Sequence, residues 1–275
     1  MVKFQPVIKW TGSKRSQSEK ILEKFPKKIK TYYEPFVGGG SVMYQLLHSE
    51  IEVEEIICSD INNDLISLWN KIKSNPEFLI NEYSLLWKTM KDLNDIDKRK
   101  EYFYSIRSKF NETRNPELFL FLSRTCTNGL IRYNSSGNFN TSLHFSRNGI
   151  EPSKLAKIIN EWSSKLNERN VKFVNQSYEV IESVEGDFIY LDPPYANTKG
   201  IYYGVIDYEK FWGWIKSQEG KYILSFDGKR EAVDNTYAVP EKLYSEHIYL
   251  KSGRSSFKDL KQQVVEVVYE SLYIK

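Results

Sequence analysis

The chain has few cysteines and no long apolar run, and these two absences narrow the class of protein. Its 275 residues include two cysteines, Cys58 and Cys126, with no histidine at metal-ligand spacing, so neither a zinc site nor a disulfide framework is expected. No run of eighteen apolar residues is present to span a membrane. The N-terminus lacks the apolar core of a secretory signal. We therefore expect a cytoplasmic protein that binds no metal and contacts no membrane.

The net charge is also small. A formal charge of +3 does not by itself indicate a nucleic-acid partner, so local clusters of charge carry more information than the total. Hydrophobic residues make up 40% of the chain and aromatic residues 15%, which is enough for a large core. The sequence contains no internal repeat or low-complexity linker. The composition predicts one α/β domain, or one with an insertion.

An acidic motif follows the apolar run at 187–191. The run is short, rich in β-formers and followed by two prolines, which predicts a buried strand. Asp192-Pro193-Pro194-Tyr195 therefore stands at the carboxyl end of that strand, the edge where open α/β sheets bind ligands. The prolines fix the backbone, so the carbonyls of Asp192 and Pro193 form a rigid pair of acceptors.

This rigid pair of acceptors, beside the Asp192 carboxylate, suits a planar exocyclic amine. A carboxylate and a backbone carbonyl that accept both amine hydrogens favour a pyramidal nitrogen, whose lone pair can attack an electrophile. Tyr195 stands where an aromatic ring can stack on a flipped nucleobase. The alternative is an ordinary strand-to-turn exit with a surface aspartate, and this motif alone does not decide between them.

A second ligand-binding pattern occurs near the N-terminus. A short strand at 31–34 leads into Pro35-Phe36-Val37-Gly38-Gly39-Gly40-Ser41 and then into an apolar helix at 42–47. Strand, glycine turn and helix form the nucleotide-binding opening of a doubly wound sheet, because glycines let the backbone approach a ligand. A phosphate loop would need Gly-Lys-Ser/Thr and a dinucleotide fold Gly-x-Gly-x-x-Gly, and these three glycines fit neither.

Two further groups suit the same ligand. The predicted strand at 55–59 ends at Asp60, about twenty residues beyond the glycines, where an acid can hold ribose hydroxyls. Asp60 could instead cap the helix at 62–73, or do both. Trp10 and Lys14, near the N-terminus, offer an aromatic ring and a partner for a carboxylate, or else belong to a basic surface arm. Together these residues predict an adenosine-like ligand.

From 64 to about 150 the pattern changes to amphipathic helices. This insertion ends in a predicted β-hairpin with a polar tip at 135–138. Its Asn, Arg and Ser side chains can hydrogen-bond bases and phosphates, although a solvated hairpin is the alternative. Helices are predicted around 65–69, 78–90, 102–110 and 118–122.

The α/β pattern resumes after the insertion. A predicted strand at 171–174 brings Ser177 to the same sheet edge as Asp192. The polar, aromatic loop at 196–208 is either a lid that closes over a substrate or an ordinary long loop. The basic connection at 251–258 suits a phosphate backbone. The remaining strands are predicted at 222–225, 244–250 and 264–273.

Five short motifs follow one another along nearly the whole chain, and their order matters as much as their residues. They are Lys9-Trp10-Thr11-Gly12-Ser13-Lys14, Glu34-Pro35-Phe36-Val37-Gly38-Gly39-Gly40-Ser41-Val42, Asp60-Ile61-Asn62-Asn63-Asp64-Leu65-Ile66, Asn128-Gly129-Leu130-Ile131-Arg132-Tyr133-Asn134 and Asp192-Pro193-Pro194-Tyr195. In this combination the sequence resembles the Dam-type family, the alpha group of the D12 class of DNA adenine-N6 methyltransferases. The resemblance favours a catalytic role for Asp192 over that of an ordinary surface aspartate.

The resemblance implies a Rossmann-like, S-adenosylmethionine-dependent methyltransferase sheet formed by 1–63 and 151–275, with a helical target-recognition insertion at 64–150 that ends in the β-hairpin. S-adenosylmethionine would be the cofactor, with Lys14 on its methionine carboxylate and Asp60 on its ribose. The residues implied to bind it are Trp10, Lys14, Glu34, Phe36, Gly38, Gly40, Asp60, Ile61, Ser177 and Asp192.

The family's reaction would transfer a methyl group to N6 of an adenine flipped out of a short duplex DNA motif. Asp192 and the Pro193 carbonyl would hold the amine, and Pro194 and Tyr195 would complete the catalytic motif. The positions that match DNA contacts are Asn128, Leu130, Arg132, Asn134, Asn138 and Arg147.

GATC is the first expectation for the target sequence. Members that read GATC follow the hairpin asparagine with Pro-Phe-Gly-Arg, whereas here Asn140-Thr141 leads to Ser142-Leu143-His144-Phe145-Ser146-Arg147. Methylation of cytosine N4, methylation of adenine in RNA and a non-catalytic DNA-binding subunit are the alternatives. Double-stranded DNA and a cognate restriction endonuclease are the candidate partners, in a prokaryotic or phage-infected cell. The sequence fits either a monomer or a transient dimer on DNA.

Overall fold

The computed structural model describes residues 4–144, 146, 148–195, 206–230, 233–234, 236, 238–254 and 267–275. Four predictions fall wholly or partly outside these residues: most of the loop at 196–208, the end of the basic connection at 255–258, the start of the strand at 264–273, and Arg147 among the DNA contacts. In the part of the chain that the structure describes, no helix is long and apolar enough to cross a membrane.

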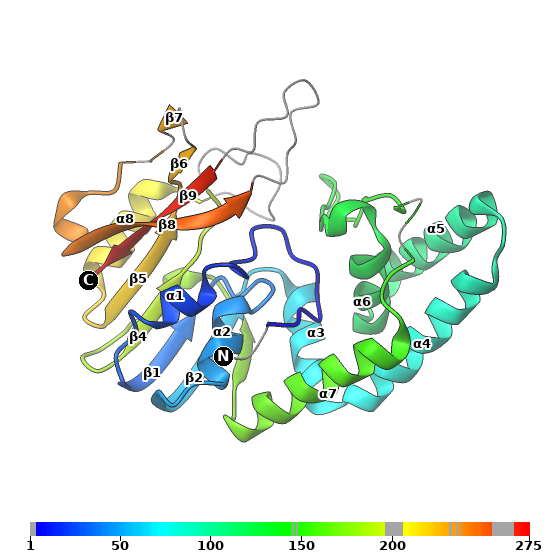
Figure 1. The fold of residues 1–275 in the computed structure, drawn as a ribbon, viewed down its shortest axis with the longest axis horizontal. Helices are drawn as coiled ribbons and strands as arrows, with labels where there is room; N and C mark the ends of the chain where they lie inside the picture. The colour runs from blue at the N-terminus through cyan, green and yellow to red at the C-terminus, as the bar shows by residue number, and fades with distance from the viewer. Residues whose placement is uncertain are drawn as a thin grey trace.

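A mostly parallel sheet forms the centre of the fold (Figure 1). Over the described residues its order is β3-β2-β1-β4-β5-β9-β6-β7, and β8 pairs with β9. The neighbours from β3 to β5 are parallel, whereas β9 runs antiparallel to β5 and β8. The strands are β1 (Lys28–Glu34), β2 (Glu52–Asp60), β3 (Lys172–Asn175), β4 (Phe188–Leu191), β5 (Lys221–Phe226), β6 (Lys229–Arg230), β7 (Val233–Asp234), β8 (Glu246–Arg254) and β9 (Val267–Ile274).

The order of the strands reverses between β1 and β4. β2 and β3 lie beyond β1 on one side, and β5 lies beyond β4 on the other. Ligands bind at such switch points, outside the carboxyl ends of the strands. Glu34 ends β1, Asp60 ends β2, and Asp192 directly follows β4. The fold therefore brings three predicted site residues to one edge of the sheet.

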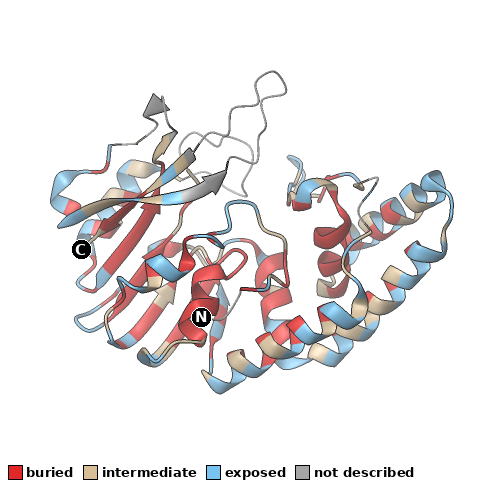
Figure 2. Ribbon diagram, in the orientation of Figure 1, coloured by how far each residue is buried: buried red, intermediate tan, exposed pale blue. Residues whose placement is uncertain are grey.

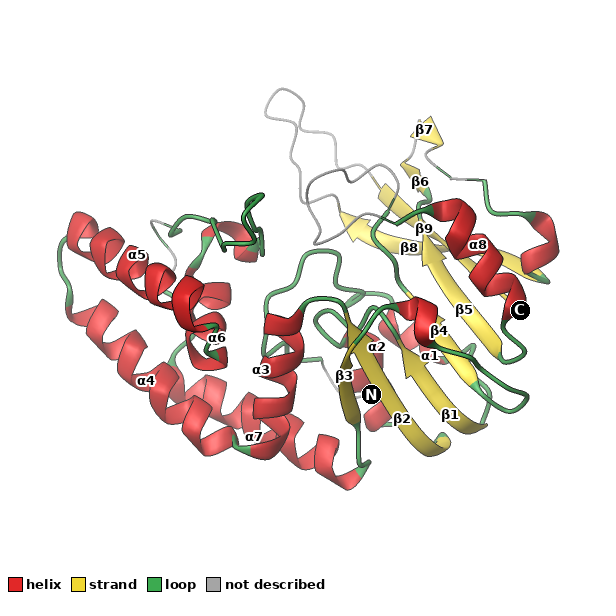
Figure 3. Cartoon of the chain, turned by 180° about the vertical axis from the view of Figure 1, so that it is seen from behind, coloured by secondary structure: helices red, strands yellow, loops and turns green. Residues whose placement is uncertain are grey.

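Helices cover both faces of the sheet (Figure 1 and Figure 3). α1 (Ser18–Leu22) and α2 (Ser41–Leu47) lie on one face, and α8 (Tyr208–Ser217) lies on the other. β4 is buried on both sides, because Phe188 and Tyr190 belong to the core that includes α2 while Ile189 and Leu191 belong to the core that includes α8. This burial explains the unbroken apolar run that predicted the strand.

A group of helices lies beside the sheet and shares its main core. Asn75 caps α4 by accepting the Phe78 N–H, and Asp95 caps α5 through the N–H groups of Asp97 and Lys98. Buried residues line the inner sides of these helices, while the outer turns of α4 and α5 are exposed (Figure 2). The helices are α3 (Asn63–Ser74), α4 (Pro76–Asp92), α5 (Ile96–Thr113), α6 (Pro116–Thr125) and α7 (Pro152–Glu168).

Trp69 on α3 connects this helical group to the sheet. Its ring stacks on Phe173 of β3, with centroids 5.5 Å apart and planes 7° from parallel. Its Nε1 donates a hydrogen bond of 3.0 Å to the Gly38 carbonyl. α3 therefore packs both on the sheet and beneath the glycine turn.

The predicted β-hairpin takes the form of a turn with isolated bridges. Tyr133 pairs with Phe139, and Cys126 pairs with Leu143. Asn134 Oδ1 accepts the backbone N–H groups of two later residues in the turn, which closes the tip. Short 3₁₀ helices occur at Thr127–Gly129, Tyr178–Val180 and Glu241–Leu243.

Candidate active site

A cavity of about 350 Å³ lies at the carboxyl ends of β1, β2 and β4. The N-terminal segment 10–14, the glycine turn, the loops after β2 and β3, and the 192–195 motif all contribute to its walls. The predicted catalytic and cofactor residues that line it are Trp10, Lys14, Glu34, Phe36, Gly38, Asp60, Ile61, Ser177, Asp192, Pro193, Pro194 and Tyr195. Gly40 is the one member of the predicted set that does not line this cavity.

Asp192 lines the cavity with a side chain that is 19% exposed. Its Oδ1 lies 2.7 Å from Lys14 Nζ. Burial raises the pKa of Asp192 to about 6; the Lys14 ammonium opposes this rise and the Glu270 carboxylate adds to it. Asp192 is therefore mostly ionised at pH 7, and its carboxylate can accept N–H hydrogens.

Lys14 lies deeper in the same wall, with a side chain only 3% exposed. Its Nζ donates to the Gly12 carbonyl at 3.2 Å and forms ion pairs with Asp192 at 2.7 Å and Glu270 at 3.6 Å. The same Nζ stands 4.9 Å from the centre of the Tyr195 ring. A buried ammonium thus links the N-terminal segment to the 192–195 motif.

The backbone of the 192–195 motif is supported by its neighbours. Tyr208 on α8 donates a 2.7 Å hydrogen bond to the Pro194 carbonyl. The Tyr195 ring packs edge-on against Phe226 at the end of β5, with centroids 5.9 Å apart. These contacts and the two prolines fix the direction of the carbonyls after Asp192.

The glycine turn is shaped around Trp10. A Cβ on Gly38 would stand 2.7 Å from Trp10 Nε1, and one on Gly39 would stand 3.0 Å from Trp10 Cβ, so side chains there would displace the indole. Gly40, a predicted cofactor residue, lies at the start of α2 outside the cavity lining. It has φ +68° at the N-cap of α2, and a Cβ there would be 2.7 Å from Met43 Cε.

Asp60 is held in place by two backbone N–H groups. Its Oδ2 accepts from Gly38 at 3.3 Å, and its Oδ1 accepts from Asn62 at 3.0 Å. Burial raises the pKa of Asp60 to about 6, against the effect of these hydrogen bonds. The helix cap considered for Asp60 is supplied by Asn62, whose Oδ1 accepts the Leu65 N–H at 3.1 Å. Asp60 is thereby oriented into the cavity.

Glu34 is a buried acid in the floor of the cavity. Burial raises the pKa of Glu34 to about 8, and the nearby Asp192 carboxylate acts in the same direction. Tyr32 Oη donates a 2.7 Å hydrogen bond to Glu34 Oε2, which opposes the rise. Glu34 is therefore mostly neutral at pH 7.

Several cavity residues are absent from the predicted site set, among them Tyr178, Glu179, Asp207 and Lys210. Tyr178 and Glu179 directly follow the predicted Ser177, so the strand-end pattern could have found them. Asp207 and Lys210 come from the start of α8, where Asp207 Oδ1 accepts two backbone N–H groups as the N-cap. Asp207 lies in the loop at 196–208 that was considered as a lid, whereas no local pattern indicates that Lys210 faces the cavity.

The described residues among the predicted DNA contacts lie on the turn at 128–140 and do not line the cavity. Asn128 is exposed with φ +57°, Arg132 and Asn134 are exposed, and Leu130 and Asn138 are half-buried. Part of their hydrogen-bonding capacity is used within the protein: Arg132 Nε donates to Asn140 Oδ1, and Asn138 Oδ1 accepts from Arg114.

Two segments attach this turn to the remainder of the site. A Cβ on Gly129 would stand 2.6 Å from Lys9 Cβ, so the turn lies against the residue before Trp10. On its other side, Tyr133 Oη donates to Asp64 Oδ2 at 2.7 Å, and Arg114 Nη1 donates to the same oxygen at 3.2 Å. The turn is therefore held between the N-terminal segment and the first turn of α3.

One face of α5 holds the backbone of the same turn. Arg107 donates to the carbonyls of Asn140 and Thr141, and Asn111 exchanges two hydrogen bonds with the Phe139 backbone. Arg114 donates to the Gly137 carbonyl at 2.7 Å. Arg107 and Asn111 are four residues apart and share one side of α5, and Arg114 directly follows the helix, with φ +55°. This face fixes the position of the turn.

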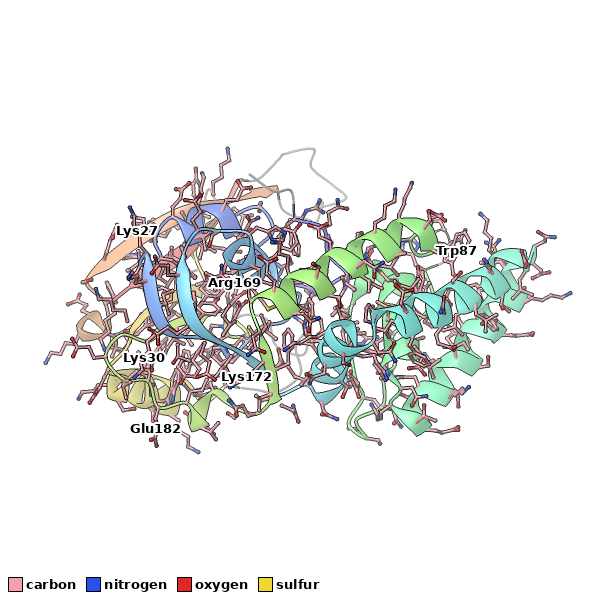
Figure 4. All side chains as sticks on the ribbon, turned by 90° about the horizontal axis from the view of Figure 1, so that it is seen from below. Lys27, Lys30, Trp87, Arg169, Lys172 and Glu182 are labelled. Carbon is pink, nitrogen blue, oxygen red and sulfur yellow. The ribbon has the colours of Figure 1, made fainter. Side chains whose placement is uncertain are left out.

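The opposite edge of the sheet has a different character (Figure 4). A second cavity there has lysines and glutamates interspersed, and Lys28 pairs with Glu52 at 3.1 Å. Arg169 donates to the Ile51 carbonyl at 2.8 Å, and Lys172 forms an ion pair with Glu55. Charges of both signs are therefore mixed on the surface at this edge.

Comparisons with known proteins agree with this geometry. A family model described as D12 class N6 adenine-specific DNA methyltransferase matches residues 10–265. The chain is 37% identical over 212 residues to the type II methyltransferase M.MjaIII of Methanocaldococcus jannaschii, covering 70% of each chain. It is 31% identical to the type II methyltransferase M1.LlaDCHI of Lactococcus lactis, covering 70% of this chain and 66% of the relative. It is 32% identical to a DNA adenine methylase of Serratia marcescens, covering 71% and 68%.

The sheet order, the switch-point cavity and these matches define a methyltransferase. The chain belongs to the D12 class of N6 adenine-specific DNA methyltransferases. It is an enzyme that methylates adenine N6 in DNA, and the predicted family, fold class and activity are confirmed.

Proposed function

We propose that the cavity binds S-adenosylmethionine and the target adenine side by side. The observation that carries this proposal is the meeting of Glu34, Asp60 and Asp192 in one cavity at the switch point of the sheet. The cavity volume of about 350 Å³ lies within the range of small-molecule sites, on the order of 300 to 1,000 Å³.

The residues present fit the cofactor. Lys14 offers a buried ammonium for the methionine carboxylate, and Asp60 offers a fixed carboxylate for the ribose hydroxyls. Trp10, packed against Gly38, offers an aromatic surface beside them. When bound, the cofactor supplies a methyl group that its sulfonium has already activated. The protein's task is then to position the acceptor amine.

Asp192 and the Pro193 carbonyl perform that task in this proposal. The adenine leaves the duplex, and its amine donates one hydrogen to the Asp192 carboxylate and one to the Pro193 carbonyl. Tyr195, fixed against Phe226, stacks on the base. The freed lone pair of N6 would accept the methyl group that the cofactor supplies as the bond of that group to sulfur breaks, and the nitrogen would lose its extra proton to solvent afterwards. No covalent enzyme intermediate is required.

We further propose that residues 64–150 form the target-recognition unit and that the turn at 128–140 reads DNA. Asn128 and Arg132 are exposed on it and suit base edges or phosphates, and Leu130 suits an apolar contact. Asn134 and Asn138, also predicted as DNA contacts, use their side-chain oxygens to accept hydrogen bonds within the protein, so we propose that they also shape the tip. GATC is the first candidate sequence.

The test is incubation with S-adenosylmethionine and methylation-free genomic DNA, followed by sequencing that reports modified bases at single positions. Adenine-N6 marks in one short motif are expected. Marks at GATC would support the first candidate; another motif would replace it. Cytosine-N4 marks, or marks in RNA alone, would contradict the proposed substrate. Failure of the purified protein to bind the cofactor would contradict the proposed pocket.

Two relatives carry the name type II methyltransferase, so a restriction endonuclease that cuts the same sequence is a candidate partner. Protection of DNA from a panel of endonucleases after methylation would identify the shared sequence. Size-exclusion chromatography with light scattering, with and without target DNA, would separate a monomer from a transient dimer.

A further inference from the structure

A single carboxylate connects the turn at 128–140 to the first turn of α3. Asp64 stands shortly after Asp60, and its side chain is only 10% exposed. Its Oδ2 accepts hydrogen bonds from two other parts of the chain: Tyr133 Oη donates at 2.7 Å, and Arg114 Nη1 donates at 3.2 Å. Tyr133 belongs to the turn, and Arg114 follows α5. The carboxylate therefore joins α3, the end of α5 and the turn at one point.

Arg114 has a backbone conformation that arginine rarely adopts. Its φ is +55°, and its N–H donates to the Phe110 carbonyl at 2.8 Å, which ends α5. Glycine is the usual residue at such a left-handed helix end, because a Cβ makes this conformation unfavourable. Glycine has no side chain that could reach the turn. The unfavourable conformation therefore points to a task for the guanidinium.

The guanidinium of Arg114 bridges Asp64 and the tip of the turn. While Nη1 donates to Asp64, Nη2 donates to the Gly137 carbonyl at 2.7 Å and to Asn138 Oδ1 at 3.3 Å. The planar guanidinium keeps these two nitrogens at a fixed distance from each other. It also lies over the Phe110 ring, 5.4 Å from the ring centre. The position of the tip thus depends on the position of Asp64.

The start of α3 also reaches the proposed cofactor site. The Asn62 backbone N–H donates to Asp60 Oδ1 at 3.0 Å, and Asn62 Oδ1 accepts the Leu65 N–H at 3.1 Å. Asn62 Nδ2 donates to Tyr133 Oη at 3.5 Å. Asp60, which we propose to bind the ribose, and Asp64, which holds the turn, therefore belong to one hydrogen-bonded helix start. This helix start sets the place of the turn relative to the cofactor.

We propose that Asp64 and Arg114 form a positioning pair that determines how well the enzyme discriminates its target sequence. The inference rests on the proposed function, in which the turn at 128–140 reads DNA. The pair touches neither the DNA nor the cofactor in this account. It holds the tip in the place from which the exposed residues of the turn contact the duplex. A displaced turn loses contacts to the correct bases, and those contacts supply the difference between the target and other sequences.

The test compares methylation of a duplex that carries the target motif with methylation of duplexes that differ from it by one base pair. In the wild type, one such change should lower kcat/KM by roughly tenfold to a hundredfold. Asp64→Asn removes the charge and keeps the size of the side chain. We expect its KM for the target duplex to rise by about tenfold, its kcat to change by less than about twofold, and its discrimination to fall by about fivefold or more. Cofactor affinity without DNA should stay at the wild-type value.

Arg114→Gln tests the other partner of the pair. The Arg114 side chain is 34% exposed, so this variant leaves the core intact and tests the inference even if Asp64→Asn does not fold. Both single variants should lose discrimination to a similar extent. The double variant should lose no more than either one, because the two residues act as a unit. The matched control is Asp97→Asn on α5, which removes an ion pair of 2.9 Å with Lys100 from a side chain that is 76% exposed. This control should keep wild-type kinetics.

Four outcomes would overturn the inference. They are wild-type discrimination in Arg114→Gln, a lower kcat with unchanged discrimination, losses that add up in the double variant, and the same loss in Asp97→Asn. Failure of the proposed function is distinguishable through Arg132→Ala, which removes an exposed side chain of the turn. Wild-type discrimination in Arg132→Ala would refute the reading of DNA by the turn. Lower discrimination in Arg132→Ala, with wild-type values in Asp64→Asn and Arg114→Gln, would refute the positioning pair alone.

Discussion

Replacement of Glu34 by glutamine should change the pH dependence of stability more than stability itself. Glu34 has a folded-state pKa of about 8, because it is buried beside Asp192. An unfolded glutamate titrates near 4.3. Between these values the native state holds a proton that the unfolded state has released. The stability contributed by this proton is complete at low pH and is lost as pH rises through about 8.

The size of this loss follows from proton linkage. Stability falls by about 1.4 kcal/mol per pH unit where one additional proton is bound in the native state. For Glu34 this amounts to about 1.5 kcal/mol between roughly pH 6.5 and 8. Asp60 and Asp192 act in the same direction, but their pKa values of about 6 confine most of their effect to lower pH. Above pH 6.5, therefore, most of the loss of stability that these three acids cause comes from Glu34.

Glutamine preserves the acceptor for Tyr32 Oη and stays neutral throughout. Urea unfolding of the wild type and Glu34→Gln at constant ionic strength, from pH 6.5 to 8, should give a declining free energy for the wild type and a flatter one for the variant. Glu54→Gln, an exposed glutamate on β2, should keep the wild-type slope. Parallel curves for the wild type and Glu34→Gln would refute the neutral, buried state of Glu34.

Two further substitutions test the turns around the site. Gly40→Ala should destabilise the protein by about 1–3 kcal/mol, because φ is +68° and the new Cβ would stand 2.7 Å from Met43 Cε. Gly213→Ala, which meets nothing within 4 Å on α8, should be neutral or slightly stabilising by thermal unfolding; equal losses would contradict this account. Tyr133→Phe removes the 2.7 Å hydrogen bond to Asp64 and should weaken DNA binding several-fold while cofactor affinity stays unchanged. Unaltered DNA affinity by fluorescence anisotropy would show that this bond does not position the turn.

Two of the predicted site residues that line the cavity, Asp60 and Asp192, stand at strand ends. A buried run such as 187–191 has one carboxyl end, and in a parallel sheet all such ends meet at one edge. This is why Asp60 and Asp192 could be assigned to one site without coordinates. The raised pKa values of both acids, by contrast, depend on burial, which local patterns do not report.

The features that the sequence did not predict are non-local or depend on packing. Glu270 reaches the site through antiparallel pairing at the far end of the chain, and no motif indicates that pairing. Gly40 looks identical to Gly38 in a run of three glycines, yet it faces Met43 instead of the cavity. Asn62 took the capping role considered for Asp60, because the Asp60 carboxylate accepts backbone N–H groups from two loops.

The central claim is that Asp192 holds the adenine amine during methyl transfer. The most direct measurement compares the wild type and Asp192→Asn for methylation of unmodified duplex DNA, with cofactor and DNA affinities measured on the same preparations. The account predicts N6-methyladenine in one short motif for the wild type, none above background for the variant, and cofactor and DNA binding that largely survive. N6-methyladenine formed by Asp192→Asn at a rate close to that of the wild type would contradict it.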